Sequence, residues 1–201
     1  MNLANKLTLT RICIVPLYIL FMELSGFSNT ILALLLFIVA SITDFFDGKI
    51  ARRNKIVTSL GIFLDPLADK MLISASFICF TSIPFLNIPA WMVISIITRE
   101  FLITGLRSIA AYKNLIIPAD MAGKFKTTSQ IVAILLITLI LILNEYFIAN
   151  PTSVYLNKYF LQYSNFVNKT PFWITFVIVI FTVISGLNYI RKYKGLLLNE
   201  K

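Results

Sequence analysis

Long apolar segments, separated by short runs of charged or turn-forming residues, make up most of this 201-residue chain. A helix of about 20 apolar residues is long enough to cross the hydrocarbon core of a bilayer. Backbone polar groups inside a bilayer must be satisfied within the segment, so such segments fold as helices. We predict six spans, over residues 8–27, 29–53, 59–83, 89–112, 119–147 and 171–190. The expected fold is all-α: one domain over residues 1–201, an integral membrane bundle of six transmembrane helices.

The composition excludes an ordinary soluble domain. Hydrophobic residues make up 58% of the chain and charged residues only 13%, whereas soluble domains are about half apolar and about a quarter charged. The net charge of +9 could indicate nucleic-acid binding, but the basic residues cluster at predicted helix ends. Membrane topology and anionic lipid or phosphate substrates explain this charge better, so no nucleic-acid partner is expected.

The basic residues also predict the orientation of the chain. One side of the membrane would carry most of them: Lys6, Arg11, Arg52, Arg53, Lys55, Lys113, Lys124, Lys126, Arg191, Lys192 and Lys194. The other side would carry only Lys158 and Lys169, within an aromatic and polar segment, residues 148–170, that suits the membrane interface. Because cytoplasmic loops are enriched in Lys and Arg, both termini and the turn near residue 55 are predicted to be cytoplasmic.

The reactive side chains present in the sequence limit the reaction mechanisms and metal sites that are possible. The chain has no histidine, which excludes histidine bases, Ser-His triads and histidine metal sites. Cys13 and Cys79 both lie in apolar segments without other metal ligands nearby, so neither a disulfide nor a cysteine metal site is expected. This inventory favours direct displacement over a covalent enzyme intermediate.

Between residues 44 and 69, aspartates and small residues recur at helical spacing within apolar sequence. They form two sets: Asp44, Asp47, Gly48, Ala51 and Arg52, then Gly61, Asp65 and Asp69. Intervals of three and four residues place each set on one face of a helix. If the two helices face each other, four carboxylates surround a space that the small residues leave open for a ligand.

Helix-end charges in solvated turns would explain any two of these aspartates. Four on matching faces favour a functional site, because ionisable residues within membrane segments are costly and usually face a functional cavity. Carboxylate oxygens without nitrogen or sulfur ligands suit Mg²⁺ or Mn²⁺. Two such ions would normally hold phosphate oxygens, so we predict a site for two divalent ions.

Arg99 and Glu100 lie in the middle of the fourth predicted span. A buried structural ion pair explains these two residues at least as well as a functional role does.

Arg107, Lys124 and Lys126 lie where the fourth span ends and the fifth begins, with Asp120 as the one acidic residue within a helical turn. Topological anchoring is one explanation of these charges. The preferred interpretation is a cationic pocket for a phosphate-bearing acceptor, because arginine and lysine both bind phosphate.

The pattern D-x2-D-G-x2-A-R-x8-G-x3-D-x3-D resembles the signature of the CDP-alcohol phosphatidyltransferases, and every fixed position is present. The resemblance implies that family's membrane fold, divalent-metal dependence and homodimeric assembly. It also implies the family's reaction, in which an alcohol hydroxyl attacks the β-phosphorus of a CDP-linked lipid and CMP leaves.

The same resemblance assigns roles to the signature residues. Asp44, Asp47 and Asp65 would hold the metal ions on the diphosphate. Asp69 would ligate as well or act as general base on the acceptor hydroxyl. The other positions would contact the CDP-lipid, with Gly48, Ala51 and Gly61 leaving space for the cytidine and Arg52 contacting the phosphates.

Outside the signature, NKLTLTR, IPAWMV, REFLITGLRSIAAYKN and GKFKTTSQ look like the bacterial phosphatidylglycerophosphate synthases of this family. This likeness covers roughly residues 2–130. It implies a bacterial inner-membrane enzyme that uses CDP-diacylglycerol and glycerol 3-phosphate, the phosphate of which suits Arg107, Lys124 and Lys126.

Two alternatives stay open. Serine or inositol-phosphate acceptors share the signature. A cation or lipid transporter could also use intramembrane carboxylates, although transporters usually contain repeats or paired broken helices and the sequence contains no visible repeat.

Overall fold

The computed structural model describes residues 3–54, 59–112, 121–150 and 167–198. These residues form long helices and no strand, so the all-α prediction is confirmed for them. The elements are α1 (Leu3–Glu23), α2 (Phe27–Asn54), α3 (Ser59–Ser82), the 3-10 turn η1 (Pro84–Leu86), α4 (Ala90–Tyr112), α5 (Met121–Ala149) and α7 (Thr170–Leu198). Most of the predicted outer segment, residues 151–166, lies outside the described residues.

Helix bounds differ from the predicted spans mainly at α1 and α7. The first helix begins at Leu3, within the predicted lead-in, and the last continues to Leu198, eight residues beyond the predicted end of its span. The physical reason is that hydropathy marks where an apolar run ends, whereas a helix continues through polar residues that are good helix formers.

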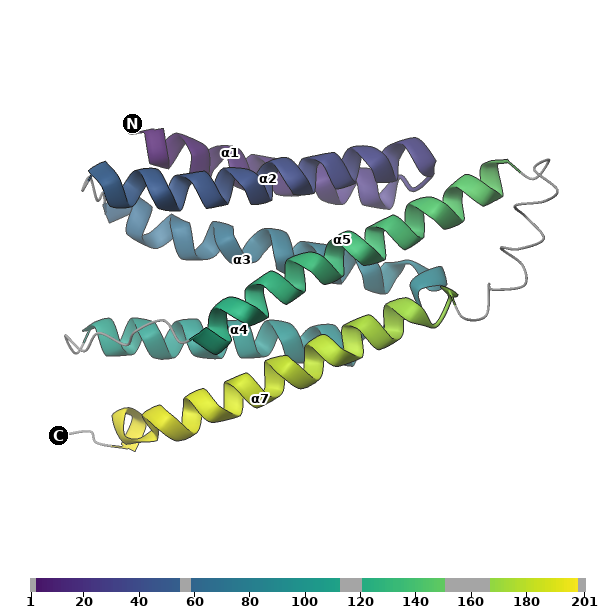
Figure 1. Ribbon diagram of the computed structural model, residues 1–201. Helices are drawn as coiled ribbons and strands as arrows, with labels where there is room; N and C mark the ends of the chain where they lie inside the picture. Colours follow the sequence, from purple (N-terminus) through teal and green to yellow (C-terminus); the bar gives the residue numbers. More distant parts are fainter. Residues whose placement is uncertain (1–2, 55–58, 113–120, 151–166, 199–201) are drawn as a thin grey trace.

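Successive helices run antiparallel, so that their ends gather at two ends of the bundle (Figure 1). At one end α1 begins, α2 ends, α3 begins, α4 ends, α5 begins and α7 ends. We call it the signature end, because the aspartate-bearing halves of α2 and α3 lie there. The α1–α2 turn and η1 lie at the far end.

A tight turn at the far end reverses the chain between α1 and α2. Ser25 and Gly26 both have positive φ, 44° and 94° respectively. The Gly26 amide donates a 3.0 Å hydrogen bond to Oε1 of Glu145 on α5, which fastens this turn to a helix distant in sequence. Glycine suits the turn because it adopts positive φ without steric cost.

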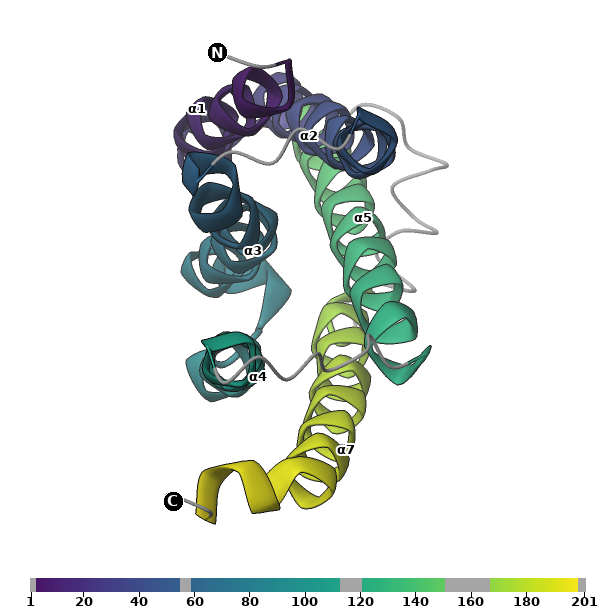
Figure 2. The same ribbon diagram turned by 90° about the vertical axis from the view of Figure 1, so that its left-hand side faces the viewer.

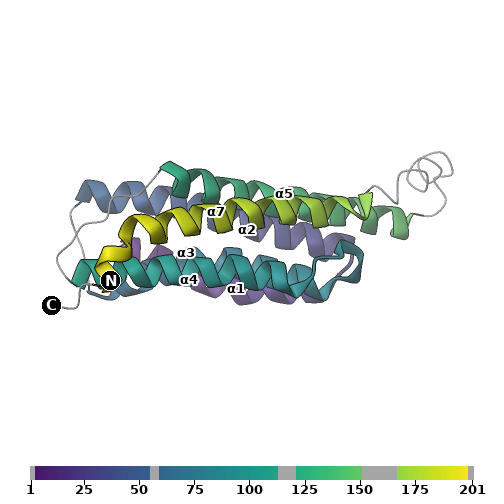
Figure 3. The ribbon, with the colours of Figure 1, turned by 90° about the horizontal axis from the view of Figure 1, so that it is seen from below.

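The bundle has two layers, with α1, α3 and α4 in one and α2, α5 and α7 in the other (Figures 2 and 3). Helix α1 packs against α2 and α3, and α7 packs against α4 and α5. Helix α3 contacts α2, α4 and α5, so it lies at the junction of most of the bundle. The largest fully buried apolar side chains lie in the middle and toward the far end: Tyr18, Phe37, Phe77, Phe80, Leu86, Met92, Ile96, Ile134 and Ile137.

The outward faces of the helices are apolar as well. More than two-fifths of the residue surface is exposed at positions such as Leu17, Leu35, Ile94, Phe101 and Phe181. A surface so rich in exposed large apolar residues marks contact with a membrane or a partner.

Two helical segments among the described residues are long and apolar enough to cross a membrane, Phe125–Ala149 and Thr170–Tyr193. The parts of α2 and α3 at Phe27–Thr43 and Lys70–Ser82 are apolar as well. Together with the apolar outward faces, these lengths identify a membrane protein.

Candidate active site at the signature end

The aspartate signature occupies two helices that meet at one end of the bundle. The first set, residues 44–52, lies in the last turns of α2, and the second, residues 61–69, lies in the first half of α3. Asp44 is ten residues from the end of α2 and Asp69 is ten residues from the start of α3. At 1.5 Å per residue, both lie about 15 Å from the helix ends that gather here.

Continuous helix through both sets confirms the geometry on which the predicted faces depend. Helices α2 and α3 contact each other, and α1 packs against both. The side chains of Asp44, Asp47, Gly48, Ala51, Arg52, Gly61, Asp65 and Asp69 lie outside the described part of the structure. The shared carboxylate site therefore stays a prediction. Elsewhere, the described residues contain no group of three or more His, Cys, Asp or Glu that could hold a metal ion.

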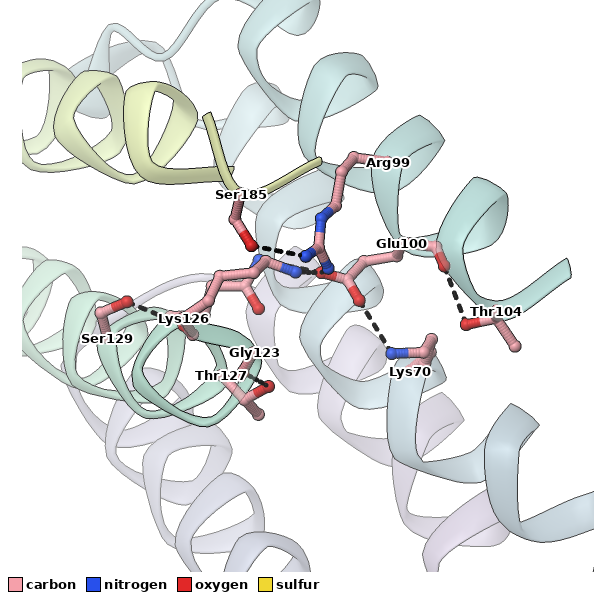
Figure 4. Close-up of polar contacts among 10 residues, drawn as sticks. Lys70, Arg99, Glu100, Thr104, Gly123, Lys126, Thr127, Ser129 and Ser185 are labelled. Atoms are coloured by element: carbon pink, nitrogen blue, oxygen red, sulfur yellow. Dashed lines mark hydrogen bonds and ion pairs between the residues drawn. The ribbon is translucent and has the colours of Figure 1, made fainter. Parts of the chain in front are cut away.

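A buried polar cluster lies beside this region, where α3, α4 and α5 meet (Figure 4). Its centre is Glu100 on α4, with 7% of its surface exposed. Nζ of Lys70, on α3, donates a 2.8 Å hydrogen bond to Glu100 Oε2. Nζ of Lys126, on α5, forms an ion pair with Glu100 Oε1, and Gln130 Nε2 lies 3.5 Å from the same oxygen. We call Lys70, Arg99, Glu100, Lys126 and Gln130 the Glu100 cluster.

The predicted Arg99–Glu100 ion pair exists, but it is the weakest contact of the two residues. Their closest charged atoms are 3.7 Å apart. Arg99 instead donates a 2.9 Å hydrogen bond from Nη2 to Oγ of Ser185 on α7. Glu100 is therefore held chiefly by lysines from other helices, and Arg99 chiefly joins α4 to α7.

Lys126 is placed differently from what its sequence neighbourhood indicates. Its predicted role depended on having few acidic neighbours on its own helix, yet the structure pairs it with Glu100 from α4 and buries it to 3% exposed. Sequence reasoning also missed Lys70 and Gln130. The available signal was that Lys70 and Glu100 each interrupt an apolar helix, as charges that pair across helices do.

Arg107 lies seven residues beyond Glu100, about 10 Å nearer the signature end. It is exposed, and its Nε donates a 3.3 Å hydrogen bond to the hydroxyl of Tyr189 on α7. A Cβ placed on Gly123 of α5 would lie 4.0 Å from Arg107 Nη2. The start of α5 and the end of α4 are therefore close together. Of the three predicted acceptor-binding residues, the structure brings Arg107 near the helix turn that precedes Lys126, while the side chain of Lys124 lies outside the described residues.

The all-helical fold and the complete signature define a class of protein. Residues 1–163 match the CDP-alcohol phosphatidyltransferase family, and the chain belongs to that family.

Individual relatives refine this assignment. The chain is 45% identical over 145 residues to the CDP-diacylglycerol–glycerol-3-phosphate 3-phosphatidyltransferase of Bacillus subtilis (strain 168), covering 66% of this chain and 74% of that protein. It is 39% identical over 138 residues to the protein of the same name from Rickettsia typhi, covering 69% and 76%. It is also 41% identical to a probable phosphatidylglycerophosphate synthase of Mycobacterium tuberculosis, covering 66% and 64%. The family resemblance inferred from the sequence is confirmed.

Proposed function

We propose that the protein transfers a phosphatidyl group from CDP-diacylglycerol to glycerol 3-phosphate, giving phosphatidylglycerophosphate and CMP. One observation carries the proposal. All eight signature positions lie on two contacting helices, in the halves nearest the signature end, in a chain whose relatives are named for this reaction.

The reaction needs positioning and charge neutralisation more than covalent chemistry. The acceptor hydroxyl oxygen bonds to the β-phosphorus, the bond from that phosphorus to the bridging oxygen breaks, and CMP leaves with the bridging oxygen. In our proposal Asp69 accepts the hydroxyl proton or serves as a fourth metal ligand. Arg52 contacts the phosphates, while Gly48, Ala51 and Gly61 leave room for the cytidine.

The donor set fits the proposed cofactor. Asp44, Asp47, Asp65 and Asp69 offer only carboxylate oxygens, the ligand type that suits two Mg²⁺ or Mn²⁺ ions. When bound, these ions would neutralise charge on the diphosphate and on the leaving phosphate.

Arg107 supports the acceptor assignment, because it is an exposed cation near the start of α5. Lys124 and Lys126 follow Gly123 on that helix. We propose that the three cationic residues bind the phosphate of glycerol 3-phosphate, a dianion that serine does not offer.

The lipid substrate requires a membrane setting. We propose six transmembrane helices in a bacterial inner membrane, with the signature end and both termini in the cytoplasm, and a homodimeric assembly. The excess of basic residues near the signature end supports this orientation.

The proposal is tested with the detergent-solubilised protein, CDP-diacylglycerol, Mg²⁺ and a panel of acceptors. We expect CMP release with glycerol 3-phosphate and none with serine or inositol phosphate. Release with either of those acceptors would overturn the acceptor assignment. No release with any alcohol would overturn the transferase assignment and favour transport. Asp69→Asn serves as the control for contaminating activity.

A further inference from the structure

Glu100 is the one carboxylate whose side chain the structure describes in the middle of the signature half of the bundle. Three cationic side chains surround it: Lys70, Arg99 and Lys126. Figure 4 shows Lys70 and Lys126 reaching its carboxylate from different helices. A buried carboxylate is stable only with such partners, and its partners in turn depend on it, because an uncompensated buried charge is strongly unfavourable.

Among the described residues, the pocket that Glu100 lines is too small for substrate. A pocket lined by Lys70, Ser74, Glu100, Thr127 and Gln130, among others, has a volume of only about 10 Å³. That is close to the minimum needed for one water molecule. A substrate of three carbons and a phosphate does not fit in this pocket, so the contacts that the structure describes for Glu100 are those with its neighbours.

Lys126 connects this buried carboxylate to the exposed Arg107. Gly123, one helical turn before Lys126, is the residue on which an added Cβ would lie 4.0 Å from Arg107 Nη2. Arg107 on α4 and Gly123 on α5 lie nearest the signature end. Lys126 lies one helical turn further into the bundle, and it is paired there with Glu100. An anion bound beside Arg107 would therefore lie about one helical turn from Lys126.

We infer that Glu100 is a positioning residue for the acceptor phosphate, acting through Lys126. The inference rests on the proposed function. Lysine carries its charge on a flexible four-carbon stem, and fixing that stem before the ligand arrives removes part of the entropic cost of binding. Glu100 fixes Lys126 from α4, while Lys70 holds the carboxylate from the α3 side. The result is an ammonium group already placed for the phosphate.

The test compares Glu100→Gln, Lys126→Gln and the double variant in steady-state kinetics. Glu100→Gln keeps the shape of the side chain and removes its charge. We expect it to raise the KM for glycerol 3-phosphate about tenfold or more, the loss expected for a hydrogen bond to a charged group. The kcat and the KM for CDP-diacylglycerol should change far less. In the Lys126→Gln background, Glu100→Gln should add little, because residues that act as a unit are non-additive.

A second pair of variants separates positioning from stability. Glu145→Gln removes a carboxylate charge at the far end of the bundle, where Glu145 accepts from the Gly26 amide, and should leave both KM values unchanged. Glu100→Asp keeps the charge on a shorter side chain, so its KM for glycerol 3-phosphate should lie between those of the wild type and Glu100→Gln. If Glu100→Gln fails to fold, Glu100→Asp is compared with the wild type alone and should show a higher KM for glycerol 3-phosphate.

Equal effects of Glu100→Gln on both KM values, a loss of thermal stability alone, or full additivity with Lys126→Gln would overturn the inference while leaving the proposed function intact. A wild-type protein that releases no CMP with glycerol 3-phosphate would overturn the proposed function, and this inference with it.

Discussion

The guanidinium of Arg107 lies over the ring of Tyr189, with Cζ 5.6 Å from the ring centroid, and its Nε donates a hydrogen bond to the Tyr189 hydroxyl. Arg107 is on α4 and exposed, whereas Tyr189 is on α7 and buried to 6% exposed. A buried tyrosine on one helix therefore holds an exposed arginine on another. In the proposed reaction this contact presents Arg107 to the acceptor.

Tyr189→Phe is expected to raise the KM for glycerol 3-phosphate a few-fold without lowering kcat. The variant keeps the ring under the guanidinium and loses only the hydroxyl acceptor. A hydrogen bond contributes about 0.5–1.5 kcal/mol net. Tyr189→Leu should raise that KM further, because it also removes the cation–π contact. Initial rates over a range of acceptor concentrations measure both effects.

Tyr146→Phe is the matched control for this change. Tyr146 lies at the far end of α5, where its ring packs against Phe27 with centroids 5.5 Å apart. The Tyr146→Phe variant should leave the KM for glycerol 3-phosphate unaltered. An unchanged acceptor KM in Tyr189→Leu as well would show that Tyr189 does not present Arg107.

Asp69→Asn is expected to abolish phosphatidyl transfer while leaving binding of CDP-diacylglycerol measurable. The change keeps the size of the side chain and removes its capacity to accept a proton. CMP release measures transfer, and a shift in Tm on addition of the lipid measures binding. Transfer at the wild-type rate would remove Asp69 from the mechanism.

Removal of divalent ions is expected to stop transfer, and added Mg²⁺ or Mn²⁺ to restore it. The ions should also raise Tm, because a ligand that binds only the folded state stabilises it. Asp44→Asn and Asp65→Asn should each lose most of that rise. Full activity in excess chelator, or an undiminished rise in Tm in both variants, would contradict the predicted metal site.

The helices were largely predictable from the sequence, because apolar segments of bilayer length have few alternatives to helix. The helical placement of the signature was predictable as well, since intervals of three and four residues are typical of a helix face. The faces that its side chains share stay a prediction. The residues at which helices end were harder to predict from the sequence. The helix α7 continues past Arg191 and Lys192 to Leu198, because charged residues end an apolar run without ending a helix.

The Glu100 cluster could not be predicted in the same way. Lys70 and Gln130 each lie 30 residues from Glu100 in the sequence, in helices before and after its own. Their meeting depends on how α3, α4 and α5 pack and rotate, which helical periodicity within one segment does not specify. Because Arg99 and Glu100 are adjacent in the sequence, they suggested a local ion pair. Their main partners lie on other helices, which the sequence of one segment does not reveal.

Helix α7 lies close to α4 at Gly186. A Cβ added there would lie 3.0 Å from Cγ of Arg99, a distance that real Cβ atoms rarely show. Arg99 has little freedom to move aside, because its guanidinium is hydrogen-bonded to Ser185, the residue before this glycine. Small residues at helix contacts in membranes allow such approaches. Gly105, on α4, provides a comparison because a Cβ there would meet nothing within 4 Å.

Gly186→Ala is therefore expected to lower Tm relative to Gly105→Ala. Both changes replace a helical glycine with alanine and gain roughly 0.5–1 kcal/mol of helix propensity, so the difference between them reports the contact with Arg99. Gly105→Ala should match or exceed the wild-type Tm. Thermal unfolding of the two variants in one detergent measures the difference. Equal Tm values would mean that Arg99 yields without cost, and that Gly186 is not needed for the contact between α4 and α7.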